Sequence, residues 1–253
     1  MCSDVRRDVA LVYDKFLVEG GGERVFGLIA AAFPDAKIYA LNAHPKEFWE
    51  EKFGRKIITP PLGFLFRSRY TVILLYPLAC VLMMLLKVNA NKTIAYTSSC
   101  GKYIKFNSKV SILYANHPNR GVFDTKAVIK SRLIRWILSP FIRVARFFEL
   151  KQLKRFDKIY SISETARQAM YRFTGMTSVV LTCPFDKGFL GLLPTESKGD
   201  TRSGEPSFLL ISRLEPEKNI AYVIDIFRHL SFKLRVVGSG SQLKSLSDRA
   251  SSN

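Results

Sequence analysis

The chain has 253 residues, of which 47% are apolar, so it is long enough for one large domain or two small ones. Its formal net charge of +18 is high for a cytosolic enzyme and indicates an anionic partner, which could be nucleic acid, acidic lipid headgroups or a phosphorylated substrate. The four cysteines form neither a Cys-x-x-Cys pair nor a zinc-type cluster with histidine, so they argue against a metal site and favour free thiols in a reducing compartment. No secretory signal is visible, because residues 1–8 are polar and charged.

The first elements predict an α/β fold. A buried strand at residues 9–13 leads into Gly20, Gly21 and Gly22, and a helix at residues 25–33 and a second strand at residues 37–41 follow. This β-α-β order is typical of a Rossmann-like, doubly wound parallel sheet. The glycines would let a ligand approach the backbone at a helix N-terminus, where an anion is favoured. A tight turn without a ligand explains three glycines about as well.

One apolar segment, Tyr70 to Leu86, raises the question of a membrane span. It carries no charge and is flanked by Arg67, Arg69 and Lys87. It is short for a bilayer span and contains Pro77. We therefore expect a buried or interfacial helix in preference to a transmembrane one.

Further strands are expected at residues 93–96, 110–114 and 158–162. The polar segment from Asn116 to Arg120 follows the second of these strands, and Asp124 comes four residues later. Ligands of open α/β sheets bind at this carboxyl edge of the strands. His117 could therefore act as an acid or base near neutral pH, although a structural loop histidine remains the alternative.

A long basic amphipathic stretch covers residues 125–156, and Pro140 should kink or divide it. Its cations are Lys126, Lys130, Arg132, Arg135, Arg143, Arg146, Lys151, Lys154 and Arg155, and its interleaved apolar residues are Ile129, Leu133, Trp136, Ile137, Phe141, Phe147 and Phe148. The aromatic residues favour an anionic membrane surface over nucleic acid. The remaining alternative is a helix whose Lys and Arg stems cover core surface.

The next elements are a helix at residues 163–173 with Ser163 as its N-cap, and a strand at residues 178–182. A segment rich in Gly, Ser and Pro then indicates a linker, which we place at residues 191–206. This divides the chain into a first domain at residues 1–190 and a second, incomplete Rossmann-like domain at residues 207–253.

The second domain opens with a pattern suited to a diphosphate. The apolar run at residues 208–211 is followed by Arg213, Lys218 and the start of a helix. An arginine fork, a lysine charge and a helix N-terminus together favour a diphosphate, although ordinary solvated charges are an equal alternative. A strand at residues 234–237 then runs into Gly238 and Gly240. The combination suggests a nucleotide-sugar site.

With these motifs in place, the sequence resembles glycosyltransferase family 4, which has the two-domain GT-B fold. The matching segments are Gly20-Gly21-Gly22-Glu23-Arg24 for the family's G-G-A-E-R loop, Phe33-Pro34-Asp35-Ala36-Lys37-Ile38-Tyr39, Tyr96-Thr97-Ser98-Ser99, Tyr114 to Arg120 for Y-C-H-T-P-x-R, Phe156 to Ser163, Ser212-Arg213-Leu214 with Lys218-Asn219, and Val236 to Gly240. The resemblance implies transfer of a sugar from a nucleotide diphosphate sugar with retention of configuration, without a catalytic metal or other cofactor. It implies a lipid-linked or saccharide acceptor and a peripheral position on the cytoplasmic membrane face.

The resemblance also implies roles for single residues. Arg213 and Lys218 would neutralise the leaving diphosphate. Gly20 and Gly21 would approach the donor phosphates or the acceptor, and the later pair Gly238 and Gly240 would shape the nucleotide pocket. Arg120 and Asp124 would lie on the acceptor side.

Two departures from the family pattern affect these expectations. An unshifted alignment puts Asn116 where the family has its functional histidine and His117 at the following threonine, so both are catalytic candidates. The family's later Glu-x7-Glu region does not occur in these 253 residues. We therefore expect weak or no transferase activity from this chain alone. The alternative function is a catalytically inactive or split-enzyme subunit that binds a membrane or a complementing subunit, with no role for nucleic acid.

Overall fold

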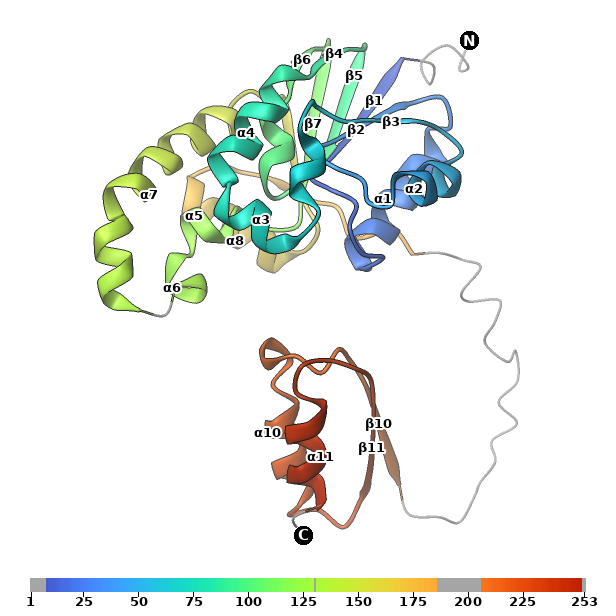
Figure 1. Cartoon of the computed structure of the whole chain (residues 1–253), viewed down its shortest axis with the longest axis vertical. Helices are drawn as coiled ribbons and strands as arrows, with labels where there is room; N and C mark the ends of the chain where they lie inside the picture. Colours follow the sequence, from blue (N-terminus) through green and yellow to red (C-terminus); the bar gives the residue numbers. More distant parts are fainter. Residues whose placement is uncertain (1–7, 130, 186–205, 252–253) are drawn as a thin grey trace. The chain divides into compact units, whose positions relative to one another are not determined.

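The computed structural model describes residues 8–129, 131–185 and 206–251 (Figure 1). They belong to two compact units, Met1–Leu190 and Gly191–Asn253, and each unit is described separately below. Except for Pro206, the linker expected at residues 191–206 lies outside the described residues.

Unit 1 is built on a seven-stranded parallel sheet with the strand order β3-β2-β1-β5-β7-β8-β9. Its strands are β1 (Val9–Tyr13), β2 (Lys37–Ala40), β3 (Ile57–Ile58), β5 (Lys92–Tyr96), β7 (Val110–Ala115), β8 (Lys158–Ser161) and β9 (Val179–Val180). The order runs outward in both directions from β1 and β5, which is the Rossmann-type arrangement. The α/β fold class predicted from the sequence is therefore confirmed.

Helices connect these strands. They are α1 (Gly21–Ala32), α2 (Lys46–Phe53), α3 (Arg69–Leu74), α4 (Tyr76–Leu85), α5 (Arg120–Phe123), α6 (Thr125–Val128), α7 (Arg132–Leu153) and α8 (Glu164–Thr174), with the 3-10 turns η2 (Gly63–Phe66) and η3 (Cys100–Tyr103). A separate parallel pair is formed by β4 (Lys87–Asn89) and β6 (Lys105–Asn107). Figure 1 shows α1 and α2 on one side of the main sheet and α4 and α7 on the other.

Alternating side chains of the strands build a core on each face of the sheet, because successive residues of a strand point to opposite sides. On one face, Leu11 of β1 packs with Phe26 of α1 and Trp49 of α2. On the other face, Val12 packs in a cluster with Met83 of α4. Full burial of such side chains stabilises the fold by roughly 1.5–3 kcal/mol each. Both faces of the central strands are thus covered, as a parallel sheet requires.

The apolar segment at residues 70–86 forms two helices, α3 and α4, where the sequence suggested one. The two helices are separated at Leu75. Pro77 lies in the first turn of α4, where the helix needs no hydrogen bond from its missing N–H. Ala79, Cys80 and Met83 are buried against the sheet. Among the described residues, none of the helices combines the length and apolar character needed to cross a membrane.

The basic stretch also differs from expectation. It is divided into α6 and α7 near Ser131, which caps α7 by accepting a hydrogen bond from the Ile134 amide. Pro140 lies inside α7 and does not divide it.

Unit 2 contains a two-stranded parallel sheet and two helices (Figure 1). Its elements are β10 (Ser207–Ile211), the 3-10 turn η4 (Pro216–Lys218), α10 (Ile220–Phe227), β11 (Lys233–Val237) and α11 (Leu243–Ser251). Its buried cluster consists of Leu214, Ile220, Ile224 and Leu246. Unit 2 therefore has a β-α-β-α order and a small core.

Candidate functional site

Unit 1 contains a pocket of about 810 Å³ at the carboxyl ends of its strands. The loops that follow β1, β5, β7, β8 and β9 all contribute to it. Its lining consists of Gly21, Gly22, Val25, Tyr96, Ser98, Asn116, His117, Pro118, Asn119, Arg120, Gly121, Ile162, Ser163, Thr165, Ala166 and Cys183. The strand order reverses between β1 and β5, and the crevice at such a switch point is where open α/β sheets bind ligands.

The amino-terminal end of α1 forms one wall of the pocket. The helix begins at Gly21, four residues before the predicted start, because Glu23 caps it by accepting from the Gly20 amide at 3.1 Å. Tyr13 donates its hydroxyl hydrogen to the other oxygen of Glu23 at 3.0 Å. A Cβ at position 22 would lie 2.8 Å from the Tyr13 hydroxyl, whereas one at position 21 would meet nothing within 4 Å. The backbone at Gly21 therefore leaves room for a ligand at a helix N-terminus, which favours an anion.

A row of tyrosines underlies the same edge of the sheet. Tyr13, Tyr96, Tyr114 and Tyr160 stand in register on four neighbouring strands. The rings of Tyr13 and Tyr96 are 5.7 Å apart, and those of Tyr96 and Tyr114 are 5.3 Å apart. Burial raises the pKa of Tyr96 to about 12, although a hydrogen bond from Asn116 opposes the rise. The Tyr96 phenol thus stays neutral at physiological pH, and the rings of Tyr13, Tyr96 and Tyr114 pack into an aromatic row.

The loop from Asn116 to Gly121, called the pocket loop below, forms the opposite wall. The Oδ1 atom of Asn116 is buried and accepts no hydrogen bond from the described residues, so it is available to a ligand donor. Nδ1 of His117 lies 2.6 Å from the Pro118 carbonyl oxygen. Because a carbonyl oxygen can only accept, Nδ1 is the donor in this contact, and in the Nδ1–H tautomer Nε2 can accept a hydrogen bond.

The two remaining candidates of unit 1 are placed differently. Arg120 lines the pocket and begins α5. Asp124 follows the last residue of α5 and is not part of the pocket lining. The fold therefore brings four of the predicted residues, Gly21, Asn116, His117 and Arg120, to one pocket. Gly20 is adjacent, as the N-cap of α1.

A half-buried aspartate that the sequence did not single out, Asp14, holds the loop after β5 in place. Asp14 accepts hydrogen bonds from the amides of Ser98 at 2.9 Å, Ser99 at 3.1 Å and Gly101 at 2.7 Å, and from the Thr97 hydroxyl. Ser98 lines the pocket, so Asp14 fixes part of its wall. The only signal in the sequence was a charged residue directly after a buried strand.

A second buried network supports the pocket loop from behind. Glu149 of α7 is fully buried, and its carboxylate lies 2.9 Å from the Lys102 ammonium. It also accepts from Tyr76 at 2.5 Å, Tyr103 at 3.1 Å and Asn119 at 3.3 Å. Burial raises the pKa values of Tyr76 and Tyr103, and the negative charge of Glu149 raises them further. Asn119 is thereby tied to α7 and α4.

In unit 2, the two candidate cations lie on the connection from β10 to α10. Arg213 is exposed and pairs with Glu217 at 3.3 Å. Lys218 is exposed at the end of η4, and Asn219 follows in the left-handed conformation with φ of 52°. Both cations thus lie in the strand-to-helix connection where the pattern predicted them, and their role toward a diphosphate stays a prediction.

The glycines after β11 serve close packing. A Cβ at Gly238 would lie 1.8 Å from the Ser212 carbonyl oxygen, and one at Gly240 would lie 2.4 Å from that of Leu214. Gly240 also has φ of +158°, at the limit of the region that favours glycine. The two strand-end loops of unit 2 thus touch through their backbones. The role of these glycines in shaping a nucleotide pocket stays a prediction.

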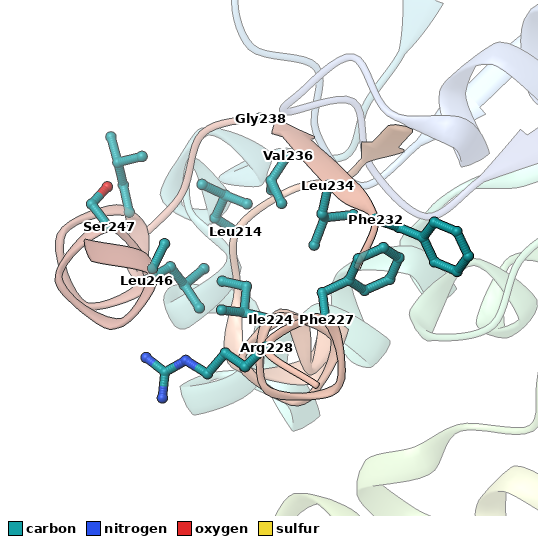
Figure 2. Close-up of a pocket in the computed structure, with 12 residues that line it drawn as sticks. Leu214, Ile224, Phe227, Arg228, Phe232, Leu234, Val236, Gly238, Leu246 and Ser247 are labelled. Carbon is teal, nitrogen blue, oxygen red and sulfur yellow. The ribbon is translucent and has the colours of Figure 1, made fainter. Parts of the chain in front are cut away.

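Unit 2 also has a pocket of about 420 Å³ between its sheet and its helices (Figure 2). Leu214, Ile224, Leu234 and Val236 surround it, and the guanidinium of Arg228 points away from it. Such a lining suits apolar groups and offers no donor set for a diphosphate.

The part of the chain that the structure describes has no cluster of three or more His, Cys, Asp or Glu residues that could hold a metal ion. Cys80 and Cys100 are buried thiols, and Cys183 is an exposed one. Burial raises the pKa of Cys80 to about 12, which keeps that thiol protonated. Cys2 lies outside the described residues.

Comparisons with known proteins show the fold. Alr3699/HepE of Anabaena, solved in complex with UDP, matches 96% of this chain and 65% of its own length, with 15% identity and a TM-score of 0.59. Its complex with UDP-glucose matches over the same lengths with a TM-score of 0.56. A glycosyltransferase from Rickettsia africae ESF-5 matches with 16% identity and a TM-score of 0.51 over 96% of this chain and 64% of its own.

This chain shares their Rossmann-like fold. It spans slightly less than two thirds of the length of these structures. No family model matches the sequence, and no curated protein matches it.

Proposed function

We propose that this protein is a glycosyltransferase of the GT-B type, from family 4, that uses a nucleotide diphosphate sugar as donor. The observation that carries the proposal is the unit 1 pocket, where the open backbone of Gly21 at a helix N-terminus faces a loop with Asn116, His117 and Arg120. HepE has been solved with UDP and with UDP-glucose, and its fold matches this one. The donor, the acceptor and the activity of the whole protein belong to this proposal.

The proposed donor-side chemistry is electrostatic. Arg213 and Lys218 would bind the two phosphates of the donor and neutralise the charge that grows on the leaving diphosphate. Two cations in one strand-to-helix loop supply the positive charge that a metal ion provides in other transferases, so the proposed reaction needs neither metal nor cofactor. Gly238 and Gly240 would keep the neighbouring turn close to the nucleotide.

On the acceptor side, we assign the unit 1 pocket to a hydroxyl of a lipid-linked or saccharide acceptor. Nε2 of His117 can accept a hydrogen bond from that hydroxyl, and Asn116 offers its buried Oδ1 to another. Retention of configuration is part of the proposal and follows from the resemblance. We also assign the protein to the cytoplasm. The three free thiols among the described residues support this, because disulfides are rare in that compartment.

The first test is a calorimetric titration of the chain with UDP and UDP-glucose, with EDTA present. The Arg213→Ala and Lys218→Ala variants should each weaken binding by roughly 10- to 100-fold, because each loses a charge-assisted contact worth about 1.5–3 kcal/mol. Lys233→Ala is the matched control, since Lys233 is an exposed cation at the opposite end of β11. The proposal fails if the wild-type chain binds neither ligand, or if all three variants bind alike.

The alternative function is a binding module, either an inactive transferase or one subunit of a split enzyme. The environment of His117 favours it, because no carboxylate among the described residues pairs with the imidazole. An activity assay separates the two functions. The binding module is supported if the chain binds UDP but transfers no sugar, and if a complementing subunit restores the transfer. Sugar transfer by the purified chain alone would exclude the binding module.

A further inference from the structure

Helix α7 has one strongly apolar face and one basic face. The apolar face consists of Leu133, Ile134, Trp136, Ile137, Phe141, Val144, Phe147 and Phe148, which recur every three or four residues. We call this set the α7 apolar face. All eight side chains are exposed, and Trp136 and Phe141 have 75% and 72% of their surface in solvent.

Two arginines on the other face of the helix, Arg135 and Arg146, contact neighbouring segments of unit 1. Arg146 donates to the Val122 carbonyl oxygen at 2.9 Å, and Arg135 donates to that of Ile129 at 2.6 Å. Figure 1 shows the amino-terminal half of α7 extending away from the sheet. A patch of eight exposed apolar side chains on one helix face marks an interaction surface.

The charges around the α7 apolar face select the kind of partner. Arg132 and Arg143 are exposed at its border, and residues 132–148 contain no acidic residue. Two copies of this face would bring like charges together. An anionic bilayer instead offers an apolar interior for the aromatic rings and negative headgroups for the arginines. The face is about 25 Å long at 1.5 Å per residue, which suits a helix lying in the plane of the interface.

We propose that the α7 apolar face docks unit 1 onto an anionic lipid bilayer. The helix lies parallel to the surface, with its aromatic side chains at the boundary between headgroups and acyl chains and the bordering Arg132 and Arg143 among the headgroups. This inference does not depend on the proposed transferase activity, because it rests on a different surface of the molecule.

The protein contains its own reporter for a test. Of its two tryptophans, Trp136 is on the α7 apolar face, whereas Trp49 is 1% exposed in the core. The full chain is titrated with vesicles of phosphatidylcholine alone and with vesicles that also contain phosphatidylglycerol. Tryptophan emission should shift to shorter wavelength, and the protein should float with the vesicles, only when the anionic lipid is present. Added salt should weaken binding, because it screens the charges.

Substitutions then locate the contact. The double variant Phe141→Ser with Phe147→Ser should bind anionic vesicles at least about tenfold more weakly, because two apolar rings no longer leave water. Tyr171→Ser on α8 removes an aromatic side chain that is 62% exposed elsewhere and should bind like the wild type. Trp136→Phe should keep binding and lose the spectral shift.

Three results would overturn the proposal. The first is the absence of flotation with either kind of vesicle. The second is equal binding to both kinds, because the charge argument would then be wrong. The third is a spectral shift that appears without lipid as the protein is concentrated, together with a dimer in sedimentation, since the face would then bind a second copy. None of these results bears on UDP binding, so the two proposals can fail separately.

Discussion

At the scale of single residues, Asp14 stabilises one wall of the unit 1 pocket. Its carboxylate accepts from three amides of the loop that follows β5. Asp14→Asn replaces one acceptor oxygen by an amide that faces those donors. We expect a loss of about 3 kcal/mol in the free energy of unfolding, measured by urea denaturation followed by circular dichroism, because hydrogen bonds to charged groups contribute roughly 1.5–3 kcal/mol each.

The control for this experiment is Asp35→Asn on an exposed loop, which should change stability by less than about 0.5 kcal/mol. Equal stability of the two variants would contradict the role of Asp14. Asp14→Asn should also lower the affinity of the unit 1 pocket for its ligand, because Ser98 forms part of the pocket wall.

Gly238 provides a second prediction for a single residue. Its added Cβ would lie 1.8 Å from the Ser212 carbonyl oxygen, so Gly238→Ala must push the two strand-end loops of unit 2 apart. We expect the amides of β10 and β11 to lose their protection from hydrogen exchange, while those of β1 and β5 keep it. Gly21→Ala is the matched control, since its Cβ would meet nothing within 4 Å. Retained protection of β10 in Gly238→Ala would show that the loops can move apart at no cost.

At the scale of elements, the buried pair of Glu149 and Lys102 joins α7 to η3. Both side chains are almost completely buried, at 0% and 3% exposure. Glu149→Gln would leave the lysine charge without a counter-charge, which costs about 3–5 kcal/mol in buried pairs. Thermal denaturation should show a correspondingly lower Tm.

A double substitution makes this prediction specific. Lys102→Met combined with Glu149→Gln removes both charges and should recover part of the stability lost in Glu149→Gln. If the two single losses simply add in the double variant, the residues do not interact as a pair.

The sequence predicted six of the seven strands of the main sheet, because each of these six is a short apolar run bounded by polar residues. The runs at residues 9–13 and 110–114 correspond to β1 and β7 almost residue for residue. The short helix α2 and strand β3 were missed, because they show no periodicity of useful length. The orientation of α7 was not predictable either: its pattern defined two faces, but only the contacts of Arg146 show which face points inward.

The site was predictable in part, for a similar reason. Motifs that follow a strand or open a helix, such as the one at Gly21 or at His117, can be located from local sequence alone. Asp14 and Glu149 act through partners that are 84 and 46 residues away, such as Ser98 and Tyr103, and only the fold brings these partners to them.

At the scale of the whole molecule, the two units have cores of very different size. Unit 1 buries apolar side chains on both faces of a seven-stranded sheet, whereas the buried cluster of unit 2 has four members among the described residues. We therefore expect unit 2 to unfold at a lower denaturant concentration than unit 1. Hydrogen exchange resolved by peptide should show β10 and β11 opening first. A single transition shared by both units would contradict this.

The hydrogen bond between Asn119 and Glu149 joins the pocket loop to the helix that we propose docks on lipid. Through this bond, a change at one surface can alter the free energy of binding at the other. If bilayer contact changes the affinity of the pocket for its ligand by some factor, the ligand must change the affinity for the bilayer by the same factor. A pocket ligand would then control how long the protein stays on the membrane, and membrane composition would control how well the pocket is filled.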